Sequence, residues 1–529
     1  MDPLSQRREL GAARACDRPT LSTTPIRAAG DDRFPWTVAI LNGSLLAVAA
    51  TSVAAWLVLG LSHLGDRYKV GHVQGIWMAL AQYANEGTLY PPLSDGIRFG
   101  GTRYMPLPIV LNAAASRATG EYLMSGKAVA MLLFVVLLIL VFVVLRQLGC
   151  PRPHAFALAG LLAATNTGVL VGCSVGGDVL PMVFQICSLL AVTRAMHRHV
   201  TGWMIVGGVL AGLAASSKLT GVWAALAVLS WLGVRQEWRR LAWFMAACCG
   251  TAALVLGMVQ WASQGRFLAT FVTVTFAGTG GPIGWVRAPS QLTFFGIGDA
   301  PAVWMIAPFA ILGTLVAWRS SSLTVYHHAL GWSLLLTLVV FTDMGAGLNQ
   351  LVDPAVLTVL AVGVLAASLP HAQLGGSTVA SALAIAVIWA GATGIRGLIP
   401  DLREVVESVR TGSTLPKYTP RPLAGAVAPG DTLLAEDPAG PVLLGQTPIV
   451  LDAFMLRRLD EVRPRAVDPF VARIERGAFD HVALIMPLDD EDYWWRYYHF
   501  GPRIIRALRS HYVLAGTVDG YYMYRPRRQ

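Results

Sequence analysis

The sequence predicts a mainly α-helical membrane protein. We expect a polytopic transmembrane bundle of about eleven spans, interfacial helices in the first external loop, and a small external C-terminal α/β domain. The first observation is composition: 54% of the 529 residues are hydrophobic and 14% are charged, whereas soluble domains are about 25% charged. The second is a series of long apolar runs. The third is a change of character after residue 400, where over half of the 31 Asp and Glu residues lie.

The formal net charge of +10 raises the question of nucleic-acid binding. The basic residues instead cluster at the ends of apolar runs, as the positive-inside rule requires of cytoplasmic loops. We therefore expect the lipid bilayer as a partner and no nucleic acid. The six cysteines have no metal-type spacing, and none lies in the C-terminal third, so no disulfide framework is indicated.

Apolar length and charge bias predict three regions. Residues 1–34 are polar and Arg-rich and are expected to form a disordered cytoplasmic tail, residues 35–399 a transmembrane domain, and residues 400–529 a soluble domain. The predicted spans are 36–61, 125–146, 154–173, 179–195, 203–216, 219–234, 242–261, 301–318, 328–342, 350–369 and 376–397. Alternation from a cytoplasmic N-terminus places the loops at about 62–122 and 262–300, and the C-terminal domain, outside. The fifth and sixth spans could instead be one broken helix.

The C-terminal region alternates short strand-like and helix-like segments, which favours an α/β domain. The predicted strands are TLLAED (432–437), TPIVLDAF (447–454), DHVALIMP (480–487) and YYMYRP (521–526), and the predicted helices are 468–477 and 493–511. The aromatic run WWRYYHF (494–500) has two interpretations. It packs a helix onto the sheet or rests at the bilayer surface, or it forms a surface on which sugars stack.

The first external loop contains two apolar segments too short for confident spans. Residues 72–86 place apolar and polar side chains on opposite sides of a helix, as in a helix lying in the membrane plane. Gly87 ends this helix, and Pro91 and Pro92 prevent it from resuming. Residues 104–120 are predicted to form a second interfacial or re-entrant helix.

The order of these segments resembles the GT-C membrane glycosyltransferases, in particular the protein-mannosyltransferase and aminoarabinose-transferase branch. The resemblance is carried by EGTLYPPLSDGIRFGGTRYMPLPIVLNAAASRATG, GKAVAMLLF, SVGGDVLPMVF, GLAASSKLTGVW, GDTLLAEDPAGPVLLGQTPIVLDAFML and RIERGAFDHVALI. It implies an inverting glycosyltransferase that moves a sugar from a polyprenyl-phosphate carrier to an envelope acceptor. That acceptor would be a polysaccharide, a glycolipid or a protein at the external face of a bacterial plasma membrane.

The resemblance also implies a carboxylate base at the start of the first juxtamembrane helix. That place reads His72-Val73-Gln74-Gly75 here. Gln74 has no base function and is kept as a substrate-binding candidate. His72 could act as a base near neutral pH or be structural. Asp66, a few residues upstream, could have taken the role or could pair with Arg67 or Lys69.

Asp178 follows Gly176 and Gly177 at the predicted external end of a span. It is a catalytic candidate, with capping of the next helix as the alternative. Asp343 and Asp353 flank another external turn, where capping is the favoured interpretation.

Basic residues near the external face could bind the carrier phosphate. Lys218 interrupts an apolar hairpin, which favours a phosphate partner over snorkelling to the interface. Arg103 with Tyr104, and Arg98, are further substrate-binding candidates. Arg287 lies in the Gly-rich segment 276–291, which we predict to be a loop able to close over substrate.

No cofactor is expected, because the sequence contains no Walker, HExxH or paired CxxC motif. A divalent cation remains open, although no ligand cluster is visible. Two other functions stay open: a non-catalytic relative that binds lipid or scaffolds envelope enzymes, and a lipid or polysaccharide transporter. The sugar, the acceptor and the oligomeric state are not encoded in any local motif.

Overall fold

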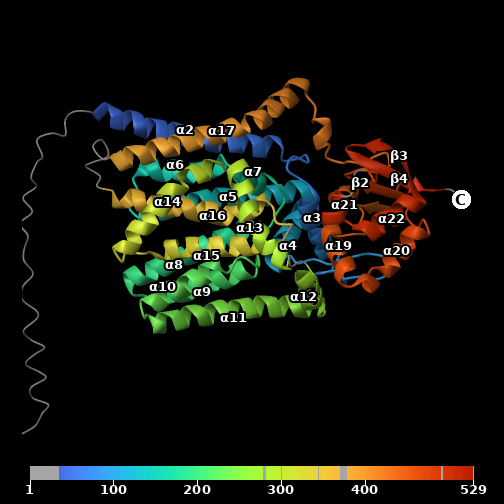
Figure 1. Ribbon diagram of the computed structural model, residues 1–529, viewed down its shortest axis with the longest axis horizontal. Coiled ribbons are helices and arrows are strands. Elements are labelled where there is room, and N and C mark those ends of the chain that lie inside the picture. Colours follow the sequence, from blue (N-terminus) through green and yellow to red (C-terminus); the bar gives the residue numbers. More distant parts are fainter. Residues whose placement is uncertain are drawn as a thin grey trace, which may run out of the picture.

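The computed structural model describes residues 35–277, 281–299, 301–343, 345–369, 378–489 and 493–527. A bundle of roughly aligned helices forms one part, and a small domain with a β-sheet lies beyond one end of it (Figure 1). The fold class predicted from the sequence is therefore confirmed. The predicted tail at residues 1–34 lies outside the described residues.

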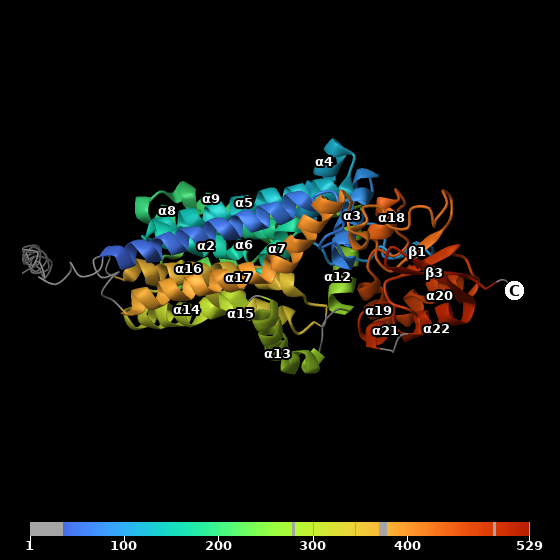
Figure 2. The same ribbon diagram turned by 90° about the horizontal axis from the view of Figure 1, so that it is seen from above.

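The bundle helices have apolar side chains that pack against neighbouring helices and further apolar side chains on the outer surface of the bundle. Its helices are α2 (Pro35–Ser62), α5 (Tyr122–Gln147), α6 (Arg152–Ala163), α7 (Asn166–Cys173), α8 (Val179–Arg198), α9 (Thr201–Ala215), α10 (Trp223–Val234), α11 (Trp238–Ala262), α14 (Pro301–Arg319), α15 (Val325–Val340), the 3-10 turn η2 (Leu348–Leu351), α16 (Val352–Ser368) and α17 (Thr378–Thr411). The first and last of the long helices, α2 and α17, lie side by side (Figures 1 and 2).

Seven helices in the described part of the chain are long and apolar enough to cross a membrane. An eighth span is possible if α6 and α7, which meet at a 69° bend, cross together. The predicted spans 203–216, 219–234 and 328–342 correspond to α9, α10 and α15, which are shorter apolar helices. Ser216–Val222 separate α9 from α10, so these two predicted spans are distinct helices.

The two helices predicted in the first loop are present as α3 (His72–Asn85) and α4 (Pro106–Thr119). Both lie between the bundle and the C-terminal domain (Figure 1). Residues 75–83 of α3 are all buried, so protein covers this helix on most sides. A Cβ on Gly75 would lie 2.5 Å from the backbone nitrogen of Ala439, which shows how closely α3 approaches the C-terminal domain.

The C-terminal domain has a four-stranded sheet of order β1-β2-β4-β3. Its strands are β1 (Leu433–Ala435), β2 (His481–Leu484), β3 (Tyr512–Val518) and β4 (Tyr521–Pro526), and its helices are α18 (Ala439–Leu443), α19 (Ala453–Val462), α20 (Asp468–Glu475), α21 (Tyr493–Tyr497) and α22 (Pro502–His511). The β1 and β2 strands are parallel, and the other two pairs are antiparallel. The predicted boundary after residue 399 falls inside α17, which continues to Thr411.

Three details of this domain differ from the sequence predictions. The segment TPIVLDAF is not a strand: Val450 forms a single bridge with Phe99, and α19 begins at Ala453. Residues 493–511 form two helices because Gly501, at φ 87°, and Pro502 interrupt them. Strand β3 was missed because most of its side chains are exposed, so no apolar alternation marks it.

The aromatic run 494–500 packs inside the domain. Trp495 and Phe500 are buried, and the indole of Trp494 donates a hydrogen bond to Glu436 at 2.7 Å. This arrangement favours the interpretation of helix-on-sheet contact over a surface for sugars.

The second long loop, which the sequence analysis places at about 262–300, is also mostly helical. It contains α12 (Arg266–Ala277) and α13 (Gly281–Asp299), and α13 stands out from the side of the bundle in Figure 2. The prediction of a Gly-rich loop over 276–291 is wrong for residues 281–291, which belong to α13. Ala288 and Phe295 of this helix pack against Phe341, so apolar contacts outweigh the local glycines.

A buried lysine fixes the end of α2. Lys127 of α5 is 0% exposed, and its Nζ donates to the carbonyl oxygens of His63 and Asp66 at 2.7 Å each. The Asp66 carboxylate lies 3.7 Å from the same nitrogen and 2.7 Å from His63 Nδ1. Asp66 thus takes part in a structural network that also accepts the backbone N–H of Tyr68.

Replacing Lys127 with methionine is expected to lower the free energy of unfolding by about 3–5 kcal/mol, because the change strands a buried carboxylate and two carbonyl groups. Thermal unfolding in detergent measures this effect. The matched control is Lys69→Met, since Lys69 makes a half-exposed ion pair with Asp401 that contributes about 0–1 kcal/mol. Equal effects of the two variants would show that the Lys127 network is not structural.

Candidate functional site

Three bundle segments converge on Lys218, in the turn between α9 and α10. Its Nζ lies 2.8 Å from Asp178 Oδ1, just before α8. Asn349 of η2 donates to both Asp178 oxygens at 3.1 Å. Asp353, in the first turn of α16, is 5% exposed and adds its charge near Lys218. Asp178 makes no capping hydrogen bond, so its carboxylate is committed to Lys218 and Asn349.

A second ion pair joins the first long loop, between α2 and α5, to the end of α15. The Arg103 guanidinium donates to Asp343 Oδ2, and the other oxygen of Asp343 accepts the N–H of Gly345. Arg103 also lies over the Phe454 ring of α19, 5.9 Å from its centroid. The Arg103 side chain is 31% exposed, about twice the 16% of Lys218. Arg103 is therefore the more accessible of the two cations.

An aromatic pair lies near both ion pairs. The rings of Trp77 and Tyr104 are 4.5 Å apart. A Cβ on Gly177, next to Asp178, would lie 2.5 Å from the Trp77 ring, so only glycine allows this approach. Burial raises the pKa of the Tyr104 hydroxyl; the Asp452, Asp178 and Asp343 carboxylates add to this shift, whereas Arg103 opposes it. Tyr104 is thus surrounded by charges from three parts of the chain.

The C-terminal domain contributes a polar group at the start of α3. His72 Nε2 lies 3.6 Å from Asp452 Oδ1, and the His72 ring lies 4.3 Å from that of His499. His499 Nδ1 in turn lies 2.6 Å from Glu436 Oε1. Burial is the main cause that lowers the pKa of His72 to about 4, and the charge of the nearby His499 adds to this effect. Burial also lowers the pKa of His499 to about 4. Both imidazoles are neutral at physiological pH.

We name this set of side chains the junction cluster, because it lies where the bundle, the first loop and the C-terminal domain meet. Its members are His72, Arg103, Tyr104, Asp178, Lys218, Asp343, Asn349, Asp353 and Asp452. Two fixed cations and four carboxylates are held in a largely buried setting, where electrostatic interactions are stronger than in water. Such a site can bind an anion at the cations and accept a proton at a carboxylate.

The structure brings together five of the predicted site residues in this cluster: Asp178, Lys218, Arg103, Tyr104 and His72. Their functional roles stay predictions. The cluster also contains Asp343 and Asp353, for which the sequence favours helix capping, and Asn349 and Asp452, which the sequence does not mark as site residues. No local motif marks Asp452, because its neighbour His72 lies 380 residues earlier in the chain.

Four predicted site residues lie outside the cluster. Asp66 belongs to the Lys127 network, while Arg67 and Lys69 pair with Asp437 and Asp401 instead. Gln74 Oε1 accepts the N–H of Gly71 at 3.0 Å and so closes the first turn of α3. Arg98 and Arg287 are exposed, in the first loop and on α13.

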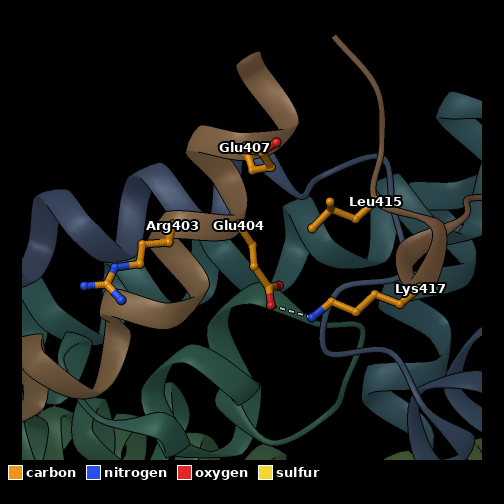
Figure 3. Close-up of a pocket in the computed structure, with 5 residues that line it drawn as sticks. All are labelled: Arg403, Glu404, Glu407, Leu415 and Lys417. Carbon is orange, nitrogen blue, oxygen red and sulfur yellow. Dashed lines mark hydrogen bonds and ion pairs between the residues drawn. The ribbon is translucent and has the colours of Figure 1, made fainter. Parts of the chain in front are cut away.

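A surface pocket of the described residues lies away from the junction cluster. Within the described ranges, no group of three or more His, Cys, Asp or Glu residues is arranged to hold a metal ion. A pocket of about 620 Å³ lies near the C-terminal end of α17, lined by Arg403, Glu404, Glu407, Leu415 and Lys417 (Figure 3). Its Lys417 pairs with Glu404, and no member of the junction cluster lines it.

The fold is similar to that of the GT-C membrane glycosyltransferases. Residues 107–262 match the family described as dolichyl-phosphate-mannose-protein mannosyltransferase. No curated protein is similar enough in sequence to count as a match. The resemblance identified from the sequence motifs is confirmed by this family match and by the solved structures below.

Two solved proteins show how far the fold is shared. ArnT from Cupriavidus metallidurans bound to undecaprenyl phosphate superposes with a TM-score of 0.54 at 14% identity, covering 90% of this chain and 97% of that one, and its apo state gives the same values. The Archaeoglobus fulgidus oligosaccharyltransferase in the apo form has a TM-score of 0.50 at 11% identity, covering 90% of this chain and 74% of that one. At these identities the likeness shows the fold.

Proposed function

We propose that this protein transfers a sugar from a polyprenyl-phosphate carrier to a hydroxyl of an acceptor at the membrane surface. The observation that carries the proposal is the pair of cations at the junction cluster, Arg103 and Lys218, in a chain with the fold of ArnT. ArnT itself has been solved with undecaprenyl phosphate bound. We propose that the acceptor is an envelope polysaccharide, glycolipid or protein. The protein itself would be a multi-pass protein of the bacterial plasma membrane and would meet this acceptor at the external face.

Arg103 is the residue best suited to the carrier phosphate. Only one of its terminal nitrogens is engaged by Asp343, so further N–H donors of the planar guanidinium are available to phosphate oxygens. The leaving phosphate gains negative charge as the bond to the sugar breaks. A cation already held in place by Asp343 and Phe454 stabilises that charge without reorganising.

Lys218 sits deeper and is offset by Asp178 and Asp353. We assign it a supporting role: it pairs with the buried carboxylates beside the reacting groups and adds positive potential near the phosphate. A carboxylate of the cluster accepts the proton of the acceptor hydroxyl as that oxygen attacks the anomeric carbon. Attack from the face opposite the phosphate inverts the configuration of the sugar.

A transfer assay tests the proposal. The purified protein in nanodiscs receives radiolabelled polyprenyl-phosphate sugars, one at a time, together with a crude bacterial envelope extract as acceptor. We expect label to appear in the extract, with release of one polyprenyl phosphate per sugar transferred. Binding of the carrier without transfer from any donor would contradict the proposal and favour a non-catalytic lipid-binding protein.

A further inference from the structure

Asp452 is the carboxylate that the C-terminal domain contributes to the junction cluster, and one of its two oxygens is uncommitted. Its Oδ1 accepts the backbone N–H of Met455 at 3.0 Å and so caps α19, and the same oxygen faces His72. Its Oδ2 accepts no hydrogen bond from any residue that the structure describes. By contrast, Asp178 is held by Lys218 and Asn349, and Asp343 by Arg103 and Gly345.

The main chain fixes Asp452 against the first external loop. Phe99 N–H donates to the Ile449 carbonyl at 2.8 Å, and Leu451 N–H donates to the Phe99 carbonyl at 2.9 Å. Two residues after Asp452, Phe454 lies under Arg103. The carboxylate is therefore held near both His72 and the Arg103–Tyr104 pair. Its side chain is 5% exposed.

The Asp452 carboxylate therefore lies beside the start of α3, whose first residue is His72. We propose that Asp452, supplied by the C-terminal domain, is the general base of the transfer; this assignment rests on the proposed function. Its Oδ2 takes the proton of the acceptor hydroxyl as the O–H bond breaks. The hydroxyl oxygen forms the new bond to the anomeric carbon, and the carrier phosphate leaves with the electron pair of the broken C–O bond.

The Asp452→Asn variant separates catalysis from structure. Asparagine caps a helix as well as aspartate does, so α19 and the contacts of the first loop are retained, but the amide cannot accept the proton. We expect kcat to fall by about 10²–10⁴-fold, the usual range for a general base, with KM and thermal stability unchanged. Asp452→Ser, a second capping residue, is expected to behave in the same way.

Asp468→Asn is the matched control, because Asp468 is an exposed acid in the first turn of α20 of the same domain. It is expected to keep full kcat.

Each outcome is decisive. Loss of kcat in both capping variants with an intact fold supports Asp452 as the base. Wild-type kcat in Asp452→Asn, or a lowered melting temperature that accounts for its loss, overturns the assignment while the proposed function stands. Absence of transfer by the wild-type protein with every donor overturns the proposed function and the assignment with it.

Discussion

Arg103→Ala is expected to reduce kcat/KM for sugar transfer by about 10²–10³-fold, the usual cost of removing one preorganised donor to a developing anion. The reason is that Arg103 is the accessible cation of the junction cluster and keeps free N–H donors beside its bond to Asp343. Arg103→Lys should recover only part of the activity, because an ammonium group lacks the planar fork that matches a phosphate. Steady-state kinetics with a polyprenyl-phosphate sugar measures both variants.

Arg98→Ala is the matched control. Arg98 lies five residues earlier in the same loop, is exposed, and stands outside the cluster. The Arg98→Ala substitution removes the same charge from the same loop. A general electrostatic effect on donor binding would therefore appear in both variants. Equal losses in Arg98→Ala and Arg103→Ala would contradict a specific role for Arg103.

Lys218→Met is expected to abolish transfer and also to destabilise the protein by about 3–5 kcal/mol, because it leaves buried carboxylates without a counter-charge. Asp178 and Asp353 are the carboxylates concerned. Thermal unfolding in detergent and the transfer assay measure the two effects separately.

The double variant Lys218→Met/Asp178→Asn tests the cause of each effect. Removing both charges of the pair should restore most of the stability, since no unpaired Asp178 charge remains. Transfer should stay lost, because the positive potential is still missing. Recovery of transfer together with stability would show that Lys218 serves the fold alone.

Most of the bundle was predictable from the sequence because bilayer thickness fixes the length of an apolar span. Helices α2, α5 and α11 follow directly from their apolar runs, and the first loop lies with the C-terminal domain at one end of the bundle, as the alternation of the predicted spans expects. Helix α13 was missed as a helix because its glycines and Pro289 suggest a loop, while its contacts with Phe341 are visible only in three dimensions.

Site residues could be predicted only where a charged side chain interrupts an apolar segment. Lys218 and Asp178 stand out because charged residues rarely interrupt apolar segments without a partner. Asp66 satisfies the same criterion, yet its partner is Lys127, and no local pattern separates a structural pair from a functional one. Asp452 could not be found at all, since its position depends on the docking of a domain that is distant in the sequence.

The anomeric configuration of the transferred sugar tests the central claim most directly. A single displacement at the junction cluster, with one carboxylate as base and the carrier phosphate as leaving group, predicts inversion. NMR of the product formed from a donor of known configuration measures it. Retention would contradict the account, because it requires a covalent sugar–enzyme intermediate or a second displacement at the same carbon.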